Sequence, residues 1–240
     1  MSGMRLADGG PVIPNFGQPS ACIKHNGWFC TDWLRSHWGD TLQPALVQHI
    51  ELTLIAVGAG FAIASLLALV GFRWRLFDGP FGIFSDFLYT IPSLALFQLL
   101  VPITGIGVTT VEIALASYTL FILYRNMIAG LRSVPAETLE AARGMGLTRV
   151  QMFLRVELPL ATPAVIAGLR IATVSTISIA TVAAFIIPQG LGEPIFTGIQ
   201  QNLFRTEILA GGVLAILLAL TADGLLTLFQ RAVTPWTRIR

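Results

Sequence analysis

The chain has 240 residues, of which 54% are hydrophobic and only 12% are charged, and its mean hydropathy is +0.74. Soluble domains carry about 25% charged residues, so this composition excludes an ordinary soluble domain and indicates a membrane protein. The formal net charge of +2 is too small to suggest a nucleic-acid partner. The length suits one domain of several helices in contact with lipid.

Residues 1–44 precede the first long apolar run and are expected to form a polar N-terminal tail. The stretch TDWLRSHWGD forms either a short amphipathic piece at the membrane interface or part of a loosely ordered tail. The tail holds both cysteines, Cys22 and Cys30, without the second ligand pair that a zinc site needs, and no metal site is expected. The sequence leaves open whether they form a short-loop disulfide or two free thiols.

Five runs are apolar and long enough to be candidates for crossing a bilayer, which takes about 20 residues. They are Ala45 to Val70, Ile83 to Ile103, Val108 to Tyr124, Ala161 to Ile187 and Ile208 to Phe229. The chain is therefore predicted to be an all-α polytopic membrane protein with about five transmembrane helices, within a transmembrane domain of residues 45–230.

The distribution of basic residues predicts the orientation. Ten basic residues fall on one set of connecting segments and four on the other, with Arg170 inside the fourth run; the ten are Arg73, Arg75, Arg125, Arg132, Arg143, Arg149, Arg155, Arg231, Arg238 and Arg240. Because cytoplasmic loops carry the excess of positive charge, the N-terminal tail is expected outside. The loops 71–82 and 125–160 and the C-terminal tail 231–240 are then cytoplasmic.

The polar segment 133–159 has the local signals of two short helices joined by a turn. Ser133 is expected to cap the first helix, with Pro135 in its first turn. Gly144 and Gly146 are expected to end that helix, because glycine adopts left-handed backbone conformations at little cost.

The second helix of this segment is expected to begin with a capping box made by Thr148 and Gln151. It is expected to end at Leu158, because Pro159 disfavours helical geometry in the residue before it. These local signals fit a docking knob for another protein and a helical hairpin on the membrane interface equally well.

The same segment resembles the EAA loop of permease subunits of binding-protein-dependent ABC importers. That pattern is Glu-Ala-Ala, three residues, Gly, nine residues, Ile, any residue and Leu-Pro, and Val156 in place of Ile is the one departure here. The resemblance implies that the loop docks on an ATP-hydrolysing subunit and couples its closure to the membrane helices. The residues that it assigns to coupling are Glu140, Ala141, Ala142, Gly146, Leu158 and Pro159.

Four further stretches are similar to the glycine betaine/choline/carnitine class of osmoprotectant permeases. They are YTIPSLALFQLLVPITGIG (89–107), LYRNMIAGLRSVP (123–135), GLRIATVSTISIATVAAFI (168–186) and GLGEPIFTGI (190–199), within a likeness from about His49 to Pro235. In one departure, Pro188 and Gln189 stand where the class often has more glycines, which would stiffen this outer loop. The resemblance implies half of a dimeric pore in a bacterial cytoplasmic membrane.

The fourth run is rich in hydroxyl side chains, among them Thr173, Thr176 and Ser178. They either hold helices together or line a weakly polar path for a solute. Pro92, followed by Ser93, either kinks the second run near a gate or bends it for structural reasons alone. Arg170 is expected to extend toward the cytoplasmic side.

The sequence has no P-loop, because its single lysine, Lys24, is not in one. The chain is therefore expected to be no enzyme and to bind no cofactor, with ATP and magnesium held by a partner ATPase subunit. About 45 extracytoplasmic residues are too few for a solute-binding domain, so a separate binding protein is expected, together with a second permease subunit, identical or related. The expected solute is a quaternary ammonium compound such as glycine betaine or choline.

Two alternatives remain at this stage. One is an importer permease for methionine or another small nutrient, which shares the EAA loop. The other is an autonomous channel or secondary carrier, which would need no ATPase partner.

Overall fold

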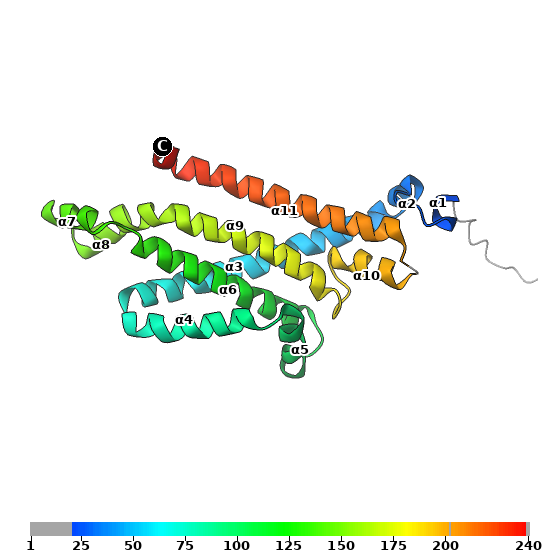
Figure 1. The fold of residues 1–240 in the computed structure, drawn as a ribbon, viewed down its shortest axis with the longest axis horizontal. Coiled ribbons are helices and arrows are strands. Elements are labelled where there is room, and N and C mark those ends of the chain that lie inside the picture. Colours follow the sequence, from blue (N-terminus) through cyan, green and yellow to red (C-terminus); the bar gives the residue numbers. More distant parts are fainter. Residues whose placement is uncertain (1–20, 202, 239–240) are drawn as a thin grey trace, which may run out of the picture.

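The computed structural model describes residues 21–201 and 203–238, and every regular element within these ranges is a helix (Figure 1). Four helical stretches there are long and apolar enough to cross a membrane: Trp38–Arg73, Val108–Arg132, Arg149–Ala183 and Arg205–Val233. A fifth crossing is available if α4 (Arg75–Thr90) and α5 (Ser93–Thr104), which meet at 101°, count as one span. The predicted all-α membrane protein with about five spans is confirmed.

The long helices α3 (Gln43–Arg73), α6 (Val108–Arg132), α9 (Leu158–Ala183) and α11 (Arg205–Val233) all run close to the long axis of the molecule (Figure 1). Three short helices, α1 (Ala21–Lys24), α2 (Thr31–Ser36) and α10 (Gly192–Gln200), lie at one end, called the α10 end below. At the other end, called the α7 end, lie α7 (Ala136–Gly144), α8 (Arg149–Met152) and the C-terminal η3 (Pro235–Arg238).

The core is built around α6, which packs between α3 and α9. Close approach depends on small residues: a Cβ on Gly60 would lie 2.6 Å from the Thr119 side chain, and one on Gly168 would lie 2.5 Å from the Asn126 Cβ. The Thr119 and Thr176 hydroxyls join α6 to α9 at 3.0 Å. Helices in lipid associate through such packing and hydrogen bonding, since burial from water contributes little there.

The expected loop 71–82 is wrong, because only Trp74 separates α3 from α4. Two acidic residues of α4 bind α6. Asp78 accepts a hydrogen bond from the Tyr124 hydroxyl at 2.7 Å and pairs with Arg132 at 2.8 Å, and Asp86 pairs with Arg125. These tertiary partners stabilise a helix whose sequence alone reads as a turn.

The interruption expected at Pro92 is present and sharp. Ile91 has extended backbone geometry (ψ 125°), as a residue before proline prefers, so α4 ends at Thr90 and α5 starts at Ser93. The Ile91 carbonyl freed by the break accepts a hydrogen bond from the Tyr118 hydroxyl. A large bend thus forms without leaving that partly buried backbone group unpaired.

The expected helix end at Leu158 is wrong. The helix that begins at Arg149 passes through the π-helical segment η2 (Phe153–Glu157) and continues past Pro159 as α9. The Leu158 amide donates to the Phe153 carbonyl, five residues back. The wider turn gives the proline ring the room that a regular α-helix denies it, so the helix is not broken.

Candidate functional site

The first helix of the 133–159 segment, α7, begins after Pro135, whose carbonyl accepts hydrogen bonds from the amides of Thr138 (3.1 Å) and Leu139 (3.3 Å). The expected cap at Ser133 is wrong. Ser133 ends α6 instead, in helical geometry, and its hydroxyl donates to the Gly130 carbonyl at 2.8 Å. A serine hydroxyl bonds back into the preceding turn as readily as forward, so its type alone does not choose between the two helices.

The turn after α7 closes on Gly146, which has φ +77°. The Gly146 amide donates to the Arg143 carbonyl at 2.9 Å, and the Leu147 amide donates to the Ala142 carbonyl at 3.2 Å. This pair of bonds is a Schellman motif, which glycine suits because it carries no Cβ. The predicted glycine stop is therefore present, with Gly146 as its left-handed residue.

The capping box predicted for the second helix is confirmed. The Thr148 amide donates to Gln151 Oε1 at 2.9 Å, and the Gln151 amide donates to Thr148 Oγ1 at 3.4 Å. The turn and the box together fix the angle between α7 and α8.

We call the segment 133–159 the knob. Its surface carries an acidic side chain together with small and apolar side chains. Glu140 and Ala141 are exposed on α7, whereas Ala142 is buried beneath them. Met145 (73% exposed) and Val150 (67%) also face outward. Exposed apolar side chains on an otherwise polar segment are typical of a protein-docking surface.

A cleft of about 1,090 Å³ lies beside the knob, between the end of α3 and η2. Three arginines line it, Arg73, Arg143 and Arg149, against one buried carboxylate, Glu157. The α7 end of the molecule is therefore strongly basic.

The hydroxyl residues of α9 differ in their surroundings. Ser178 is exposed and Thr173 half-buried, whereas Thr176 is 2% exposed and bonded to Thr119. Thr176 thus holds α9 to α6 and faces no open passage in this subunit. Pro92 is exposed and Ser93 half-buried at the break between α4 and α5, and the adjacent Ile91 packs in one cluster with the α9 core residues.

Arg170 forms an ion pair that the sequence did not suggest. Its Nε donates to Asp223 Oδ1 at 2.7 Å and its Nη2 to Oδ2 at 2.9 Å, which joins α9 to α11. Arg170 therefore has a partner within the helix bundle, where it was expected to extend toward the cytoplasm. The sequence does contain a hint of this pair, because Asp223 is a carboxylate inside the last apolar run. Which basic residue it meets depends on how α9 packs against α11.

Asp223→Ala is expected to lower the melting temperature of the purified chain, because it leaves the Arg170 guanidinium without its carboxylate partner inside the helix bundle. The double variant Arg170→Leu with Asp223→Leu should recover most of the loss, because apolar side chains replace such a pair at little cost. Melting temperatures in detergent check this. Equal values for Asp223→Ala and the native chain would show that the pair contributes nothing.

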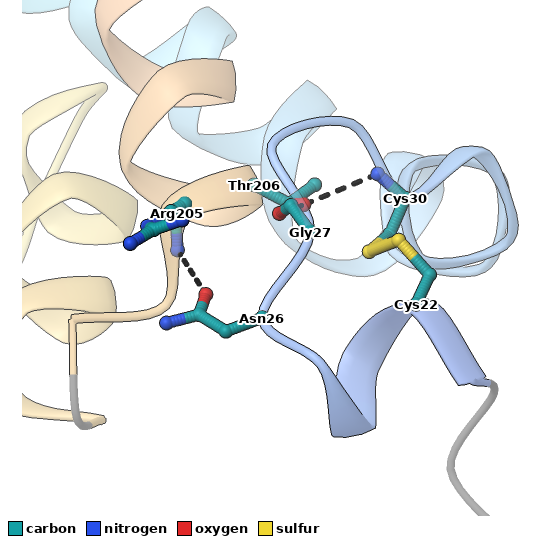
Figure 2. Close-up of a disulfide and its surroundings, with 6 residues drawn as sticks. All are labelled: Cys22, Asn26, Gly27, Cys30, Arg205 and Thr206. Carbon is teal, nitrogen blue, oxygen red and sulfur yellow. Dashed lines mark hydrogen bonds between the residues drawn. A yellow bond between two sulfur atoms is a disulfide. The ribbon is translucent and has the colours of Figure 1, made fainter.

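The N-terminal segment is folded from residue 21 onward, in place of the loose tail that was one expectation. A disulfide joins Cys22 to Cys30, and Figure 2 shows the loop between them lying against the start of α11. The Cys30 amide donates to Thr206 Oγ1 at 3.1 Å, and the Thr206 hydroxyl donates to the Gly27 carbonyl at 2.9 Å. Residues 1–20 of the expected tail lie outside the described residues.

Further contacts hold this segment at the α10 end. Asn26 accepts a hydrogen bond from the Arg205 amide at 2.9 Å and donates to the Leu203 carbonyl at 3.0 Å. Below the loop, Trp33 packs in one cluster with Cys30 and Phe204. The N-terminal segment is thus an ordered part of the α10 end.

Comparison with known proteins agrees with this architecture. Residues 49–237 match the family described as "Binding-protein-dependent transport system inner membrane component". The choline transport system permease protein OpuBB of Bacillus subtilis (strain 168) is 35% identical over 204 residues, which cover 85% of this chain and 93% of that protein. The ergothioneine transport permease/ergothioneine binding protein EgtU of Helicobacter pylori (strain G27) is 36% identical over 178 residues, 68% of this chain and 32% of that longer protein.

Among solved structures, the MetNI methionine ABC transporter in an inward-facing conformation has a similar fold, with a TM-score of 0.71 over 83% of this chain and 98% of that one, at 20% identity. The family match covers more than half of the chain, and its sequence relatives extend over most of it. The chain therefore belongs to the inner membrane components of binding-protein-dependent transport systems.

Proposed function

We propose that this chain is the membrane subunit of an ATP-driven importer and forms half of the path for a quaternary ammonium osmoprotectant such as glycine betaine or choline. Relatives named for choline, glycine betaine and carnitine transport, at 35% identity over most of the chain, support the substrate class. A second permease subunit, identical or related, completes the path.

The observation that carries the proposal is the geometry of the knob. Glu140 and Ala141 stand exposed on α7, next to a left-handed turn at Gly146 that only glycine adopts freely. We assign this surface to docking of an ATPase subunit, which holds ATP and magnesium. The unbroken helix through Leu158 and Pro159 connects the docked surface to α9.

We assign the translocation path to the region where the α4–α5 break meets α9. Pro92 and Ser93 border it at the break, and Thr173 and Ser178 offer hydroxyls from α9. Such a lining suits a solute that passes without being held strongly. Recognition at high affinity then falls to a separate extracytoplasmic binding protein.

We further propose that the N-terminal segment lies outside and the knob in the cytoplasm. The support is the charge distribution, because the α7 end holds Arg73, Arg132, Arg143, Arg149 and Arg155. After reduction, the half-buried Cys22 should react with a membrane-impermeant thiol reagent in intact cells, whereas Cys30 is buried and should react far less. Reaction only after permeabilisation would reverse this orientation.

The function is tested by reconstituting the chain with its ATPase subunits and binding protein in liposomes. ATP-dependent accumulation of labelled choline or glycine betaine is expected. Accumulation of methionine or ergothioneine, with neither quaternary compound transported or competing, would replace the proposed substrate. Uptake of either quaternary compound without ATP or an ATPase would point to an autonomous carrier.

A further inference from the structure

A small polar cavity lies at the α10 end, away from the knob. It encloses about 260 Å³ between the N-terminal segment, α10 and the start of α11, and its lining includes Thr41, Thr197, Gln201, His37, Glu193 and Glu207. Pockets for drug-sized ligands enclose about 300–1,000 Å³, so this one suits a more compact molecule. The disulfide-bonded segment forms one wall, since Trp33 and His37 also line the cavity.

Two carboxylates face this cavity, and one of them lacks a partner. Glu207 is 4% exposed, and its Oε2 is buried and accepts no hydrogen bond. Glu193 is half-buried and also lines the cavity. A buried carboxylate oxygen without a donor is costly, so Glu207 marks a position that a bound hydrogen-bond donor or cation would satisfy.

The position of each carboxylate in its helix favours the charged form. Glu193 lies in the first turn of α10 and Glu207 in the first turn of α11, where the helix dipole favours negative charge. Burial acts against this and raises the pKa of the Glu193 carboxyl. A cation in the cavity would stabilise the charged carboxylates and so offset the effect of burial.

Among the described residues that line the cavity, His37 is the one side chain that can carry a positive charge. His37 interacts electrostatically with Glu207, but its Nδ1 lies 3.0 Å from the Trp33 carbonyl and 2.9 Å from the Ser36 hydroxyl. Even a doubly protonated His37 leaves two carboxylates against one positive charge. The cavity is therefore net negative whenever both carboxylates are ionised.

The cavity lacks the form of an aromatic cage or a metal site. His37 lies flat on the Trp33 ring, with centroids 4.5 Å apart, and Phe204 meets the same ring edge-on, so Trp33 is already occupied. Within the described residues, no three histidine, cysteine, aspartate or glutamate side chains are close enough to hold a metal ion. The cavity can therefore recognise a ligand through its charge and through hydrogen bonds to a hydroxyl group.

We propose that this cavity binds a small organic monocation that carries a hydroxyl, of the choline type, and disfavours zwitterions such as glycine betaine. The cationic group would lie beside Glu207 and Glu193, with Thr41, Thr197 and Gln201 available to the hydroxyl. A zwitterion brings its own carboxylate toward the two of the protein, and like charges in one site repel. The proposal rests on the proposed function and refines its substrate class.

The test measures binding to the chain in complex with its ATPase subunits in nanodiscs, without ATP and without the binding protein. Titration with choline and with glycine betaine, followed by calorimetry, should give choline at least about tenfold tighter binding. Glu207→Gln keeps the shape of the side chain and removes its charge, so choline binding should fall at least about tenfold. Glu51→Gln, an exposed charge on α3 outside this cavity, is the matched control and should bind choline normally.

The outcomes separate this inference from the proposed function. If the importer accumulates choline in liposomes but Glu207→Gln and the native chain bind choline equally, the cavity is not the binding site. The proposed function would still hold in that case. An importer that accumulates neither quaternary compound overturns both. If Glu207→Gln does not fold, Glu193→Gln takes its place, and a change in melting temperature without a change in choline affinity would assign these carboxylates to structure alone.

Discussion

Gly146→Val is expected to abolish ATP-dependent uptake while the chain still inserts in the membrane. Gly146 has φ +77°, and a β-branched side chain cannot adopt that conformation without severe strain. The Schellman turn would open, and the knob would no longer present Glu140 at its present angle. Transport in liposomes and the amount of chain in purified membranes provide the two measurements.

Gly144→Val is the matched control for this substitution. Gly144 is the last residue of α7, its φ is not positive, and a Cβ there would meet no atom within 4 Å. Valine has a somewhat higher helix propensity than glycine, so this variant should fold normally and leave uptake close to normal. Equal loss of uptake in both variants would argue against a special role for the turn.

Glu140→Lys should also abolish uptake, because it reverses the charge at the centre of the knob. Glu137→Lys makes the same change on the same helix and should have a smaller effect, since Glu137 lies outside the Glu-Ala-Ala motif. Co-purification of the ATPase subunit reports docking directly. Normal transport in both Gly146→Val and Glu140→Lys would refute the assignment of the knob to coupling.

Gly192→Ala is the second substitution with a large expected effect, and it acts on folding. A Cβ at Gly192 would overlap the Thr181 carbonyl oxygen and come within 2.5 Å of the Ala184 Cβ. Because the first obstacle is backbone, it cannot move aside, and α10 would separate from α9. We expect a loss of about 3 kcal/mol or more, at the upper end of overpacking costs.

The folded fraction of Gly192→Ala, by size-exclusion chromatography and thermal unfolding in detergent, measures this effect. Gly212→Ala is the control, because Gly212 lies inside α11 with nothing within 4 Å of an added Cβ. Alanine favours helix over glycine, so this variant should be at least as stable as the native chain. A stable, active Gly192→Ala would mean that α9 and α10 are not held this closely.

The parts of the fold that the sequence predicted are those that depend on local composition. Apolar runs located the spans, and the Thr148–Gln151 box and the Gly146 turn are formed by residues a few positions apart. The polar stretch 71–82 reads as a loop in the sequence, but its helix is stabilised by contacts to Tyr124 and Arg132, some 50 residues away. No local pattern contains that information.

The candidate sites also divide into those formed by neighbouring residues and those formed by long-range contacts. The knob was recognisable from one continuous motif, whereas the Arg170–Asp223 pair joins residues 53 positions apart and the Cys30–Thr206 contact joins residues 176 apart. The folded structure of the N-terminal segment could not be predicted locally, because it depends on contacts with α11, at the opposite end of the sequence. The cavity that it closes could not be predicted before that contact was known.

The unbroken helix from Arg149 to Ala183 has a mechanical consequence. Its 35 residues, at 1.5 Å each, make a rod about 52 Å long that begins in the knob and ends beside α10. If that rod pivots as a rigid lever, a tilt of about 5° displaces its far end by about 4.5 Å over this length. Spin labels at the exposed Leu154 and Ser178 should keep their separation whether or not the ATPase subunits have closed, because a lever turns without changing its length.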